Sequence, residues 1–157
     1  MPTRAGCFID VSNLYFCLQK KYHRKLSYAK YMAFITSMYP KITVMKSYVA
    51  SNGKNMGFIA ALQKLGHDVR VKQVKEYSEG DSFRRKCDMD VDIALDIMES
   101  TPAMDVCVLG SADGDMAPVV ERLNRLNITT VAIACGVSSE LRSVCKECIE
   151  IPPSLLE

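Results

Sequence analysis

Short β-rich segments that alternate with amphipathic helical patterns constrain the fold of this chain more than any other feature. Strands are expected at residues 7–9, 42–50, 69–74, 106–109, 129–134 and 148–151. This alternation favours a mainly parallel sheet with helices on both faces, which is a three-layer α/β/α arrangement. The 157 residues are enough for one hydrophobic core and too few for a large second one, so we expect a single domain over 1–157.

Five helices are predicted between these strands from apolar residues at three- and four-residue spacing. Their expected inward faces are, in chain order, Leu14, Cys17, Leu18 and Tyr22; Tyr28, Met32 and Ile35; Phe58, Ala61, Leu62 and Leu65; Val91, Ala94, Leu95 and Met98; and Val119, Val120, Leu123 and Leu126. Gly66 is expected to end the third helix. In the fourth, the spacing of Asp92, Asp96 and Glu99 is typical of a solvated face.

The cysteines and the apolar runs indicate the cellular environment of the protein. No run approaches the ~18 apolar residues of a membrane span, and the first residues lack the apolar region of a signal peptide, so a cytoplasmic protein with no membrane partner is expected. The seven cysteines are odd in number and lie mostly in apolar segments, which favours free thiols. Cys145 and Cys148 form a lone C-x-x-C without the second ligand pair of a structural zinc site.

The net charge of +2 conceals a strong asymmetry along the chain. Residues 1–86 contain 16 Lys and Arg against 5 Asp and Glu, whereas residues 87–157 contain 4 against 13. Such a split predicts a surface for a polyanion beside an acidic site, and the alternative is charge scattered over solvated faces.

Several acidic residues follow expected strands directly. Asp10 ends the first strand segment, Asp113 and Asp115 follow the fourth, and Asp90 falls in the first turn of the fourth helix, toward its inward side. Ligands of open α/β sheets bind outside the carboxyl ends of the strands, so these acids are expected to converge. Converging carboxylates repel one another unless a cation neutralises them, and oxygen ligands favour Mg²⁺ or Mn²⁺. Such an ion supports phosphodiester hydrolysis. The competing interpretation is helix N-capping, above all for Ser12 and Asp88.

Basic and aromatic residues near these acids are candidate contacts for a nucleic acid. The candidate phosphate contacts are Lys20, Lys21, Arg24 and Lys25 at the end of the first helix, and Arg84, Arg85 and Lys86 in the polar segment 75–86, which is expected to be a substrate loop. Tyr22, Tyr77 and Phe83 lie among these charges and are candidates for base stacking, which would favour a single strand; for Tyr22 the alternative is packing in the core.

Three segments in order resemble a known family. They are residues 8–14 (FIDVSNL), residues 86–96 (KCDMDVDIALD) and residues 111–116 (SADGDM), the last followed by Pro-Val-Val at 118–120. Together they resemble the motifs of the NYN domain of the LabA-like type, a branch of the PIN-like nuclease superfamily, over residues 5 to about 135. The resemblance implies a PIN-like fold and metal-dependent ribonuclease activity. The residues that match the family's motifs are Asp10, Asn13, Asp90, Asp96, Ser111, Asp113 and Asp115.

This chain departs from the family pattern in two motifs. The second usually reads lysine, glycine, apolar residue, acid; here Cys87 and Asp88 stand in the middle, which leaves open whether Asp88 or Asp90 faces the metal. The family match makes Asp96 an outer ligand, in conflict with its solvated spacing. In the third motif, Gly114 and Met116 stand where serine and phenylalanine are common.

The expected function is therefore a Mg²⁺- or Mn²⁺-dependent ribonuclease acting on single-stranded RNA. Asp10, Asp90, Asp113 and Asp115 would hold the metal, and Asn13 and Ser111 would orient the acids, the water or the phosphate. The alternative left open is an inactive RNA-binding or adaptor protein on the same fold. A D-x-S-x-S adhesion site is excluded because Leu14 cannot coordinate a cation. Single-stranded DNA remains open as a substrate, as does a homodimer through the apolar edge at 148–151.

Overall fold

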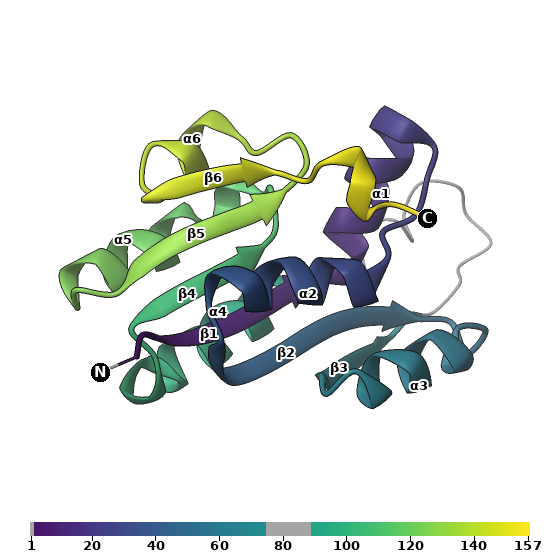
Figure 1. The fold of residues 1–157 in the computed structure, drawn as a ribbon, viewed down its shortest axis with the longest axis horizontal. Coiled ribbons are helices and arrows are strands. Elements are labelled where there is room, and N and C mark those ends of the chain that lie inside the picture. The colour runs from purple at the N-terminus through teal and green to yellow at the C-terminus, as the bar shows by residue number, and fades with distance from the viewer. Residues whose placement is uncertain (1, 75–88) are drawn as a thin grey trace.

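The computed structural model describes residues 2–74 and 89–157, which form one six-stranded sheet with helices on both faces (Figure 1). The strands are β1 Arg4–Asp10, β2 Lys41–Ser51, β3 Asp68–Gln73, β4 Val106–Gly110, β5 Thr129–Ala134 and β6 Glu147–Glu150. Each predicted strand range overlaps one of them, and β5 agrees at both ends. β6 lies at one edge of the sheet, and a homodimer through it stays a prediction.

The order of the strands creates a switch point in the middle of the sheet. The order is β3-β2-β1-β4-β5-β6, and every neighbouring pair is parallel. The chain therefore moves outward in one direction after β1 and in the other after β4. Ile9 pairs with Gly110, so Asp10 and Ser111 leave the sheet side by side at this point. Ligands of open α/β sheets bind at such a position.

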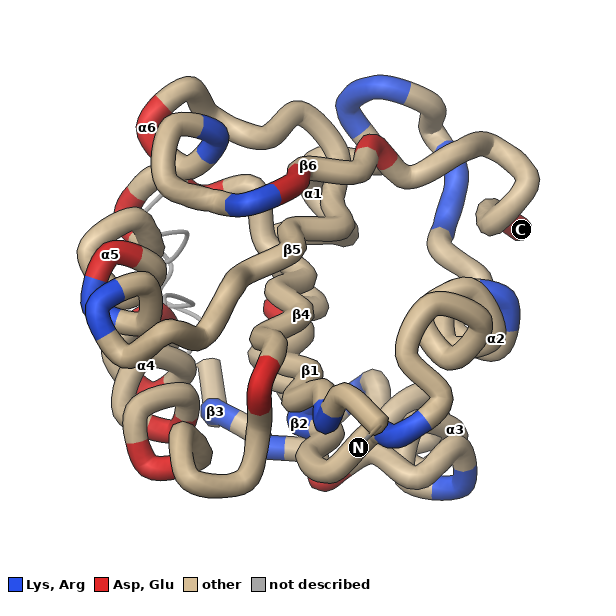
Figure 2. The backbone as a smooth tube through the Cα atoms, turned by 60° about the vertical axis from the view of Figure 1, so that its left-hand side comes forward, with Lys and Arg blue, Asp and Glu red and all other residues tan. Residues whose placement is uncertain are grey.

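Helices cover both faces of the sheet and confirm the predicted α/β/α arrangement. The helices are α1 Val11–Tyr22, α2 Tyr28–Met38, α3 Met56–Lys64, α4 Asp90–Glu99, α5 Ala117–Arg125 and α6 Ser139–Arg142, with short 3₁₀ turns η2 Thr101–Ala103, η3 Gly114–Met116 and η4 Pro153–Leu155. Figure 2 shows α2 and α3 on one side of the strands and α4 and α5 on the other.

The central strands are buried on both faces, as a parallel sheet requires. Phe8, Ile9 and Leu109 are fully buried, and burial of each such side chain contributes about 1.5–3 kcal/mol. The hydroxyl of buried Tyr31 in α2 donates to the carbonyl of Ile133 in β5 at 2.8 Å. A Cβ atom at Gly110 would lie 2.8 Å from that hydroxyl, so only glycine lets β4 end beneath α2.

Two helix ends follow from local sequence. Gly66 has φ +93° directly after α3; its N–H bonds to the carbonyl of Gln63, and the N–H of His67 bonds to that of Leu62. This is the Schellman pattern, and it confirms the predicted end of the helix. At the start of α1, the capping side chain is Asp10, which accepts from the N–H of Asn13 at 3.1 Å. The N-cap interpretation of Ser12 is therefore wrong, because the strand passes into the helix two residues earlier.

The predicted inward face of α4 is also partly wrong. Ile93 and Ile97 are fully or almost fully buried, whereas Val91 and Leu95 are 72% and 59% exposed. Both pairs have the four-residue spacing of a helix face, so periodicity alone could not choose between them. The exposed fractions show that packing against the sheet selected the isoleucine pair.

The described cysteines agree with the prediction of free thiols. The six cysteines outside the masked range are free thiols, which are Cys7, Cys17, Cys107, Cys135, Cys145 and Cys148. Burial, together with Cys148, raises the pKa of Cys145 to about 12, so that thiol carries no charge near neutral pH. In the ranges 2–74 and 89–157, no helix has the length and apolar character needed to cross a membrane.

Part of the predicted substrate site lies outside the described residues. The candidates concerned are Tyr77, Phe83, Arg84, Arg85, Lys86 and Asp88, all within 75–88.

Candidate functional site

Three aspartates meet at the carboxyl edge of the sheet. Asp90, Asp113 and Asp115 each offer one carboxylate oxygen, and these oxygens all lie within 4.8 Å of one another. Asp90 is the first residue of α4, whereas Asp113 and Asp115 belong to the turn after β4. The structure therefore brings together three of the four predicted metal-binding acids from two separate segments.

Local hydrogen bonds shape the turn that carries Asp113 and Asp115. The Oδ1 atom of Asp113 accepts from the N–H of Asp115 at 2.9 Å, so Asp113 caps η3. The buried Ser111 accepts from the N–H of Asp113 at 3.2 Å through its Oγ atom. Ser111 thus acts on the turn that places the two acids.

Asp10 lies at the neighbouring strand end but does not join the three-oxygen group. Its side chain is 9% exposed and caps α1. The pKa of Cys17 in α1 is raised by burial first, then by the charge of Asp10, with a smaller contribution from Asp113. Ile9 pairs with Gly110, so Asp10 stands next to Ser111, which is two residues before Asp113 in the chain. Asp10 is thus placed beside the cluster and not within it.

Asn13 connects the first helix to the acidic turn. Its Oδ1 atom accepts from the N–H of Ala112 at 2.9 Å, across 99 residues of sequence. Its own N–H donates to Asp10. One side chain therefore ties the ends of β1 and β4 together, which is a structural role consistent with the predicted orienting role.

The donor set of the cluster fits a hard divalent cation. All three groups are carboxylates, and none of the described Lys or Arg residues forms an ion pair with Asp113 or Asp115. Carboxylates this close repel one another unless a cation compensates their charge. Oxygen-only ligands match the preference of Mg²⁺, Mn²⁺ and Ca²⁺.

Asp96 occupies a different environment on the same helix. The hydroxyl of Tyr48 donates to its Oδ2 atom at 2.7 Å, and Lys46 Nζ and Arg70 Nε each lie 3.9 Å from that atom. Its side chain is only 15% exposed, so the predicted solvated position is wrong, although Asp92 and Glu99 are exposed as expected. Nor does Asp96 belong to the three-acid group, because its partners are on β2 and β3.

The basic end of α1 is partly committed to the C-terminal residues. Lys21 forms an ion pair with Glu150 at 3.2 Å, and Arg24 donates to the carbonyls of Leu156 and Glu157. Figure 1 shows the C-terminus beside the α1–α2 connection. Lys21 and Arg24, two of the four predicted phosphate contacts at the end of α1, are thus held by contacts with residues near the C-terminus.

The remaining candidates at this end of α1 differ in exposure. Lys20 and Lys25 are exposed and stay candidates for phosphate binding. Tyr22 is half-buried and packs against the hydrophobic core, which agrees with its core interpretation.

The sequence-based reasoning missed the polar residues of β2 and β3 that surround Asp96. Arg70 and Lys72 alternate with Val69 and Val71, which is the pattern of a strand with one charged face. That alternation was a usable signal for a basic sheet face. It could not indicate that Asp96 lies opposite.

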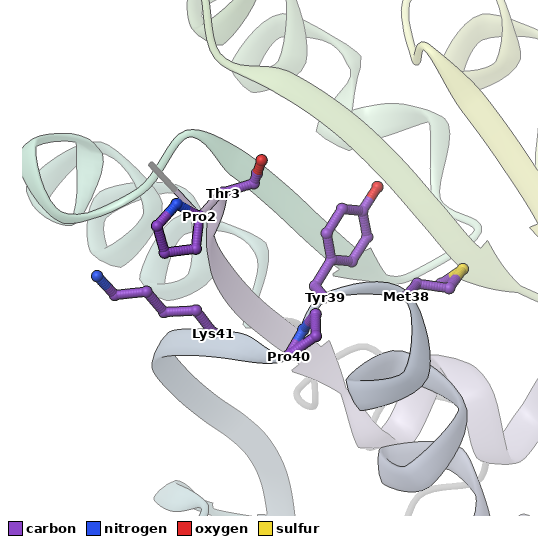
Figure 3. A pocket seen from close by; sticks show the side chains of 6 residues that line it. All are labelled: Pro2, Thr3, Met38, Tyr39, Pro40 and Lys41. Atoms are coloured by element: carbon purple, nitrogen blue, oxygen red, sulfur yellow. The ribbon is translucent and has the colours of Figure 1, made fainter.

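A hollow of about 380 Å³ lies at the amino ends of the strands, opposite the end that carries the aspartates (Figure 3). It is lined by Pro2, Thr3, Met38, Tyr39, Pro40 and Lys41. These residues stand at the amino ends of β1 and β2 and include no carboxylate or histidine. The hollow is therefore separate from the aspartate cluster.

Comparison with known proteins identifies the family. The family model described as "NYN domain" matches residues 4–153. The chain is 29% identical over 164 residues to the low amplitude and bright protein LabA of Synechococcus elongatus, covering 96% of this chain and 84% of that protein. A crystal structure of a protein of unknown function from Vibrio parahaemolyticus superposes with a TM-score of 0.86 at 27% identity, covering 99% of this chain and 97% of the other.

These matches confirm the resemblance in the three motifs, because the matched residues include all of the described candidate acids. The six-stranded parallel sheet agrees with the PIN-like fold that the resemblance implied. The chain belongs to the NYN domain family, within the PIN-like nuclease superfamily.

Proposed function

We propose that this protein is a metal-dependent nuclease that hydrolyses phosphodiester bonds of single-stranded RNA. The observation that carries the proposal is the meeting of Asp90, Asp113 and Asp115 within 4.8 Å at the switch point of the sheet. Membership of the PIN-like nuclease superfamily supports the same reaction class.

The three aspartates would hold Mg²⁺ or Mn²⁺. Such an ion, when bound, lowers the pKa of a water molecule and stabilises negative charge that develops on a phosphate. Asp90 comes from a different segment than Asp113 and Asp115, so a bound cation would also join α4 to the turn after β4. We assign a metal-facing role to Asp90 because one of its carboxylate oxygens lies within 4.8 Å of those of Asp113 and Asp115.

Asp10, Asn13 and Ser111 would complete the site. Asp10 stands next to Ser111 at adjacent strand ends, where its carboxylate can accept a proton from an attacking water or bind the cation through water. Asn13 and Ser111 hold the backbone of residues 112 and 113 by hydrogen bonds. Catalytic groups held by such supporting bonds lose less entropy when substrate binds.

The charge distribution supports a polyanionic substrate. Figure 2 shows acidic segments on α4 and basic segments along β2, β3 and the α1–α2 turn, whereas α5 and α6 carry residues of both signs. Phosphate contacts by lysine and arginine position a nucleic acid without reading its sequence. The charge split along the sequence, which predicts a polyanion surface beside an acidic site, supports the same proposal.

The test is cleavage of a labelled single-stranded RNA by purified protein with Mn²⁺ or Mg²⁺, with and without chelator. We expect cleavage that the chelator abolishes and that Asp113→Asn reduces by about 100-fold or more, since a lost metal ligand removes several kcal/mol of charge stabilisation. Asp92→Asn is the matched control, because Asp92 is exposed on α4 next to the cluster but outside it. A single-stranded DNA of the same sequence tests the sugar requirement.

Two outcomes would contradict the proposal. Equal cleavage by wild type and Asp113→Asn would remove the assigned site. Binding of RNA by the wild type without cleavage under any of these metals would favour the non-catalytic RNA-binding function.

A further inference from the structure

Edge strand β3 carries an exposed arginine in line with the aspartate site. We propose that Arg70 binds a backbone phosphate of the RNA strand within a few nucleotides of the scissile position, an inference that rests on the proposed nuclease function. Neither the family match nor the acidic cluster assigns a role to this residue.

The sheet register places Arg70 in one row with the site. Arg70 pairs with Tyr48 on β2, and Tyr48 pairs with Asp10 on β1. Neighbouring strands lie about 4.8 Å apart, so the backbone of Arg70 is roughly 10 Å from that of Asp10. A strand bound at the aspartates would therefore reach β3 within a few phosphates.

Two carboxylates hold the arginine by one edge of its guanidinium group. Arg70 Nε lies 3.9 Å from an oxygen of Asp96 and 3.9 Å from an oxygen of Asp68. Across residues 2–74 and 89–157, no hydrogen bond involves the two Nη nitrogens of Arg70, and the side chain is 51% exposed. The fork of donors that matches a phosphate in two-point contacts is thus presented to solvent.

Asp96 is shared between Arg70 and a second cation. Lys46 Nζ also lies 3.9 Å from the oxygen of Asp96 that Arg70 approaches, so two cations share that carboxylate. Exposed Lys72 follows two residues later on β3, on the same sheet face and nearer the carboxyl edge. This face of β3 therefore presents two basic residues toward the carboxyl edge, a pattern that suits contacts with phosphates.

The test compares RNA binding by wild type, Arg70→Ala, Arg70→Lys and Arg125→Ala. Arg125 is the matched control because it is an exposed arginine at the far end of α5, toward the amino edge of the sheet. Binding of a fluorescent single-stranded RNA is followed by anisotropy in the presence of chelator, so that metal-dependent cleavage does not interfere. The measurement is repeated over a range of salt concentrations.

We expect Arg70→Ala to weaken RNA binding by about 5- to 10-fold and to lower the salt slope by about 0.7, the value for one lost phosphate contact on a single strand. Arg70→Lys should fall between wild type and Arg70→Ala, because it keeps the charge and the ion pairs but loses the fork. Arg125→Ala should bind as the wild type does. Thermal melting shows whether each variant is folded. If Arg70→Ala is not folded, the RNA binding of Arg70→Lys decides whether Arg70 contacts a phosphate.

The outcomes separate this inference from the proposed function. If the wild type cleaves RNA but the Arg70 variants bind with wild-type affinity and salt slope, Arg70 is not a phosphate contact and the nuclease assignment stands. If the wild type neither binds nor cleaves RNA, both are overturned.

Discussion

Helix α4 presents two aspartates, Asp90 and Asp96, to surroundings of opposite charge. Asp90 lies with two further carboxylates at the end of the sheet. Asp96, six residues later, lies over the sheet with one hydroxyl and two cations around it. The same residue type on one short helix therefore serves two purposes, and the neighbours determine which.

The difference shows which carboxylates the chain neutralises with its own lysines and arginines and which it does not. Asp96 obtains its counter-charges from Lys46 and Arg70, so the chain neutralises it internally. Asp113 and Asp115 have no such partner among the described Lys and Arg residues and are placed against a third acid. An anionic group that is assembled but not neutralised is suited to a cation from solution. We infer that Asp96 stabilises α4 while the cluster performs the function.

The largest stability difference is expected from removing each acid in turn. Asp96→Ala leaves the buried hydroxyl of Tyr48 and the amine of Lys46 without their acceptor, which should lower the free energy of unfolding by about 3 kcal/mol. Asp113→Ala removes both repulsion and the cap of η3, and because these two effects oppose each other it should change that free energy by less than about 1 kcal/mol without metal. Urea denaturation with chelator measures both. A similar loss in the two variants would remove the distinction between the acids.

In a metal titration, substitution of Asp113 is expected to have a larger effect on the stabilisation by metal than substitution of Asp96. Mn²⁺ at 100 times its dissociation constant should stabilise the wild type by about 2.7 kcal/mol, because it binds only the folded cluster. Asp113→Asn should lose most of this increment, whereas Asp96→Asn should keep it even though its baseline stability is lower. Thermal melting at several Mn²⁺ concentrations provides the comparison. An increment that depends on Asp96 and not on Asp113 would place the metal elsewhere.

A smaller effect is expected on the opposite face of β2. Ser47 precedes Tyr48 and hydrogen-bonds through Oγ to Nδ1 of His67, whose Nε2 atom has no hydrogen-bond partner in the part of the chain that the structure describes. Burial lowers the pKa of His67 from 6.5 to about 4, so the folded state keeps this ring neutral. Below pH 6.5 the unfolded chain binds the proton and the folded chain does not, so stability falls as the pH decreases toward 4.

We expect the free energy of unfolding to be about 1 to 2 kcal/mol lower at pH 5 than at pH 7 through this group. His67→Gln should flatten this dependence. His23→Asn is the control, because His23 is exposed and asparagine tolerates its φ of 56°. Chemical denaturation at the two pH values measures the effect, and an unchanged slope in His67→Gln would contradict a neutral buried His67.

Much of the local structure could be predicted because it depends on near neighbours in sequence. Apolar β-rich runs located the strands, and Gly66 marked the end of α3 through its permitted positive φ. Acids directly after strands identified Asp113 and Asp115, because parallel strands deliver their carboxyl ends to one edge. The motif order also indicated the family that the comparisons confirm.

Other features depended on contacts between distant segments. Helical spacing offered both Val91 with Leu95 and Ile93 with Ile97 as the buried face of α4, and only packing on the sheet selected the second pair. The solvated position expected for Asp96 was wrong because its partners come from strands about 50 and 26 residues earlier in the chain.

The sequence by itself determined the alternation of strands and helices, the glycine that ends α3 and the acids at the strand ends, because backbone sterics and burial periodicity act over a few residues. The strand order β3-β2-β1-β4-β5-β6 decided the rest. It set Asp10 beside Ser111, placed Asp90 against Asp113 and Asp115, and brought Arg70 and Tyr48 to Asp96. Those juxtapositions are set by the whole sheet, because each depends on which strands become neighbours and not on the residues within any one of them.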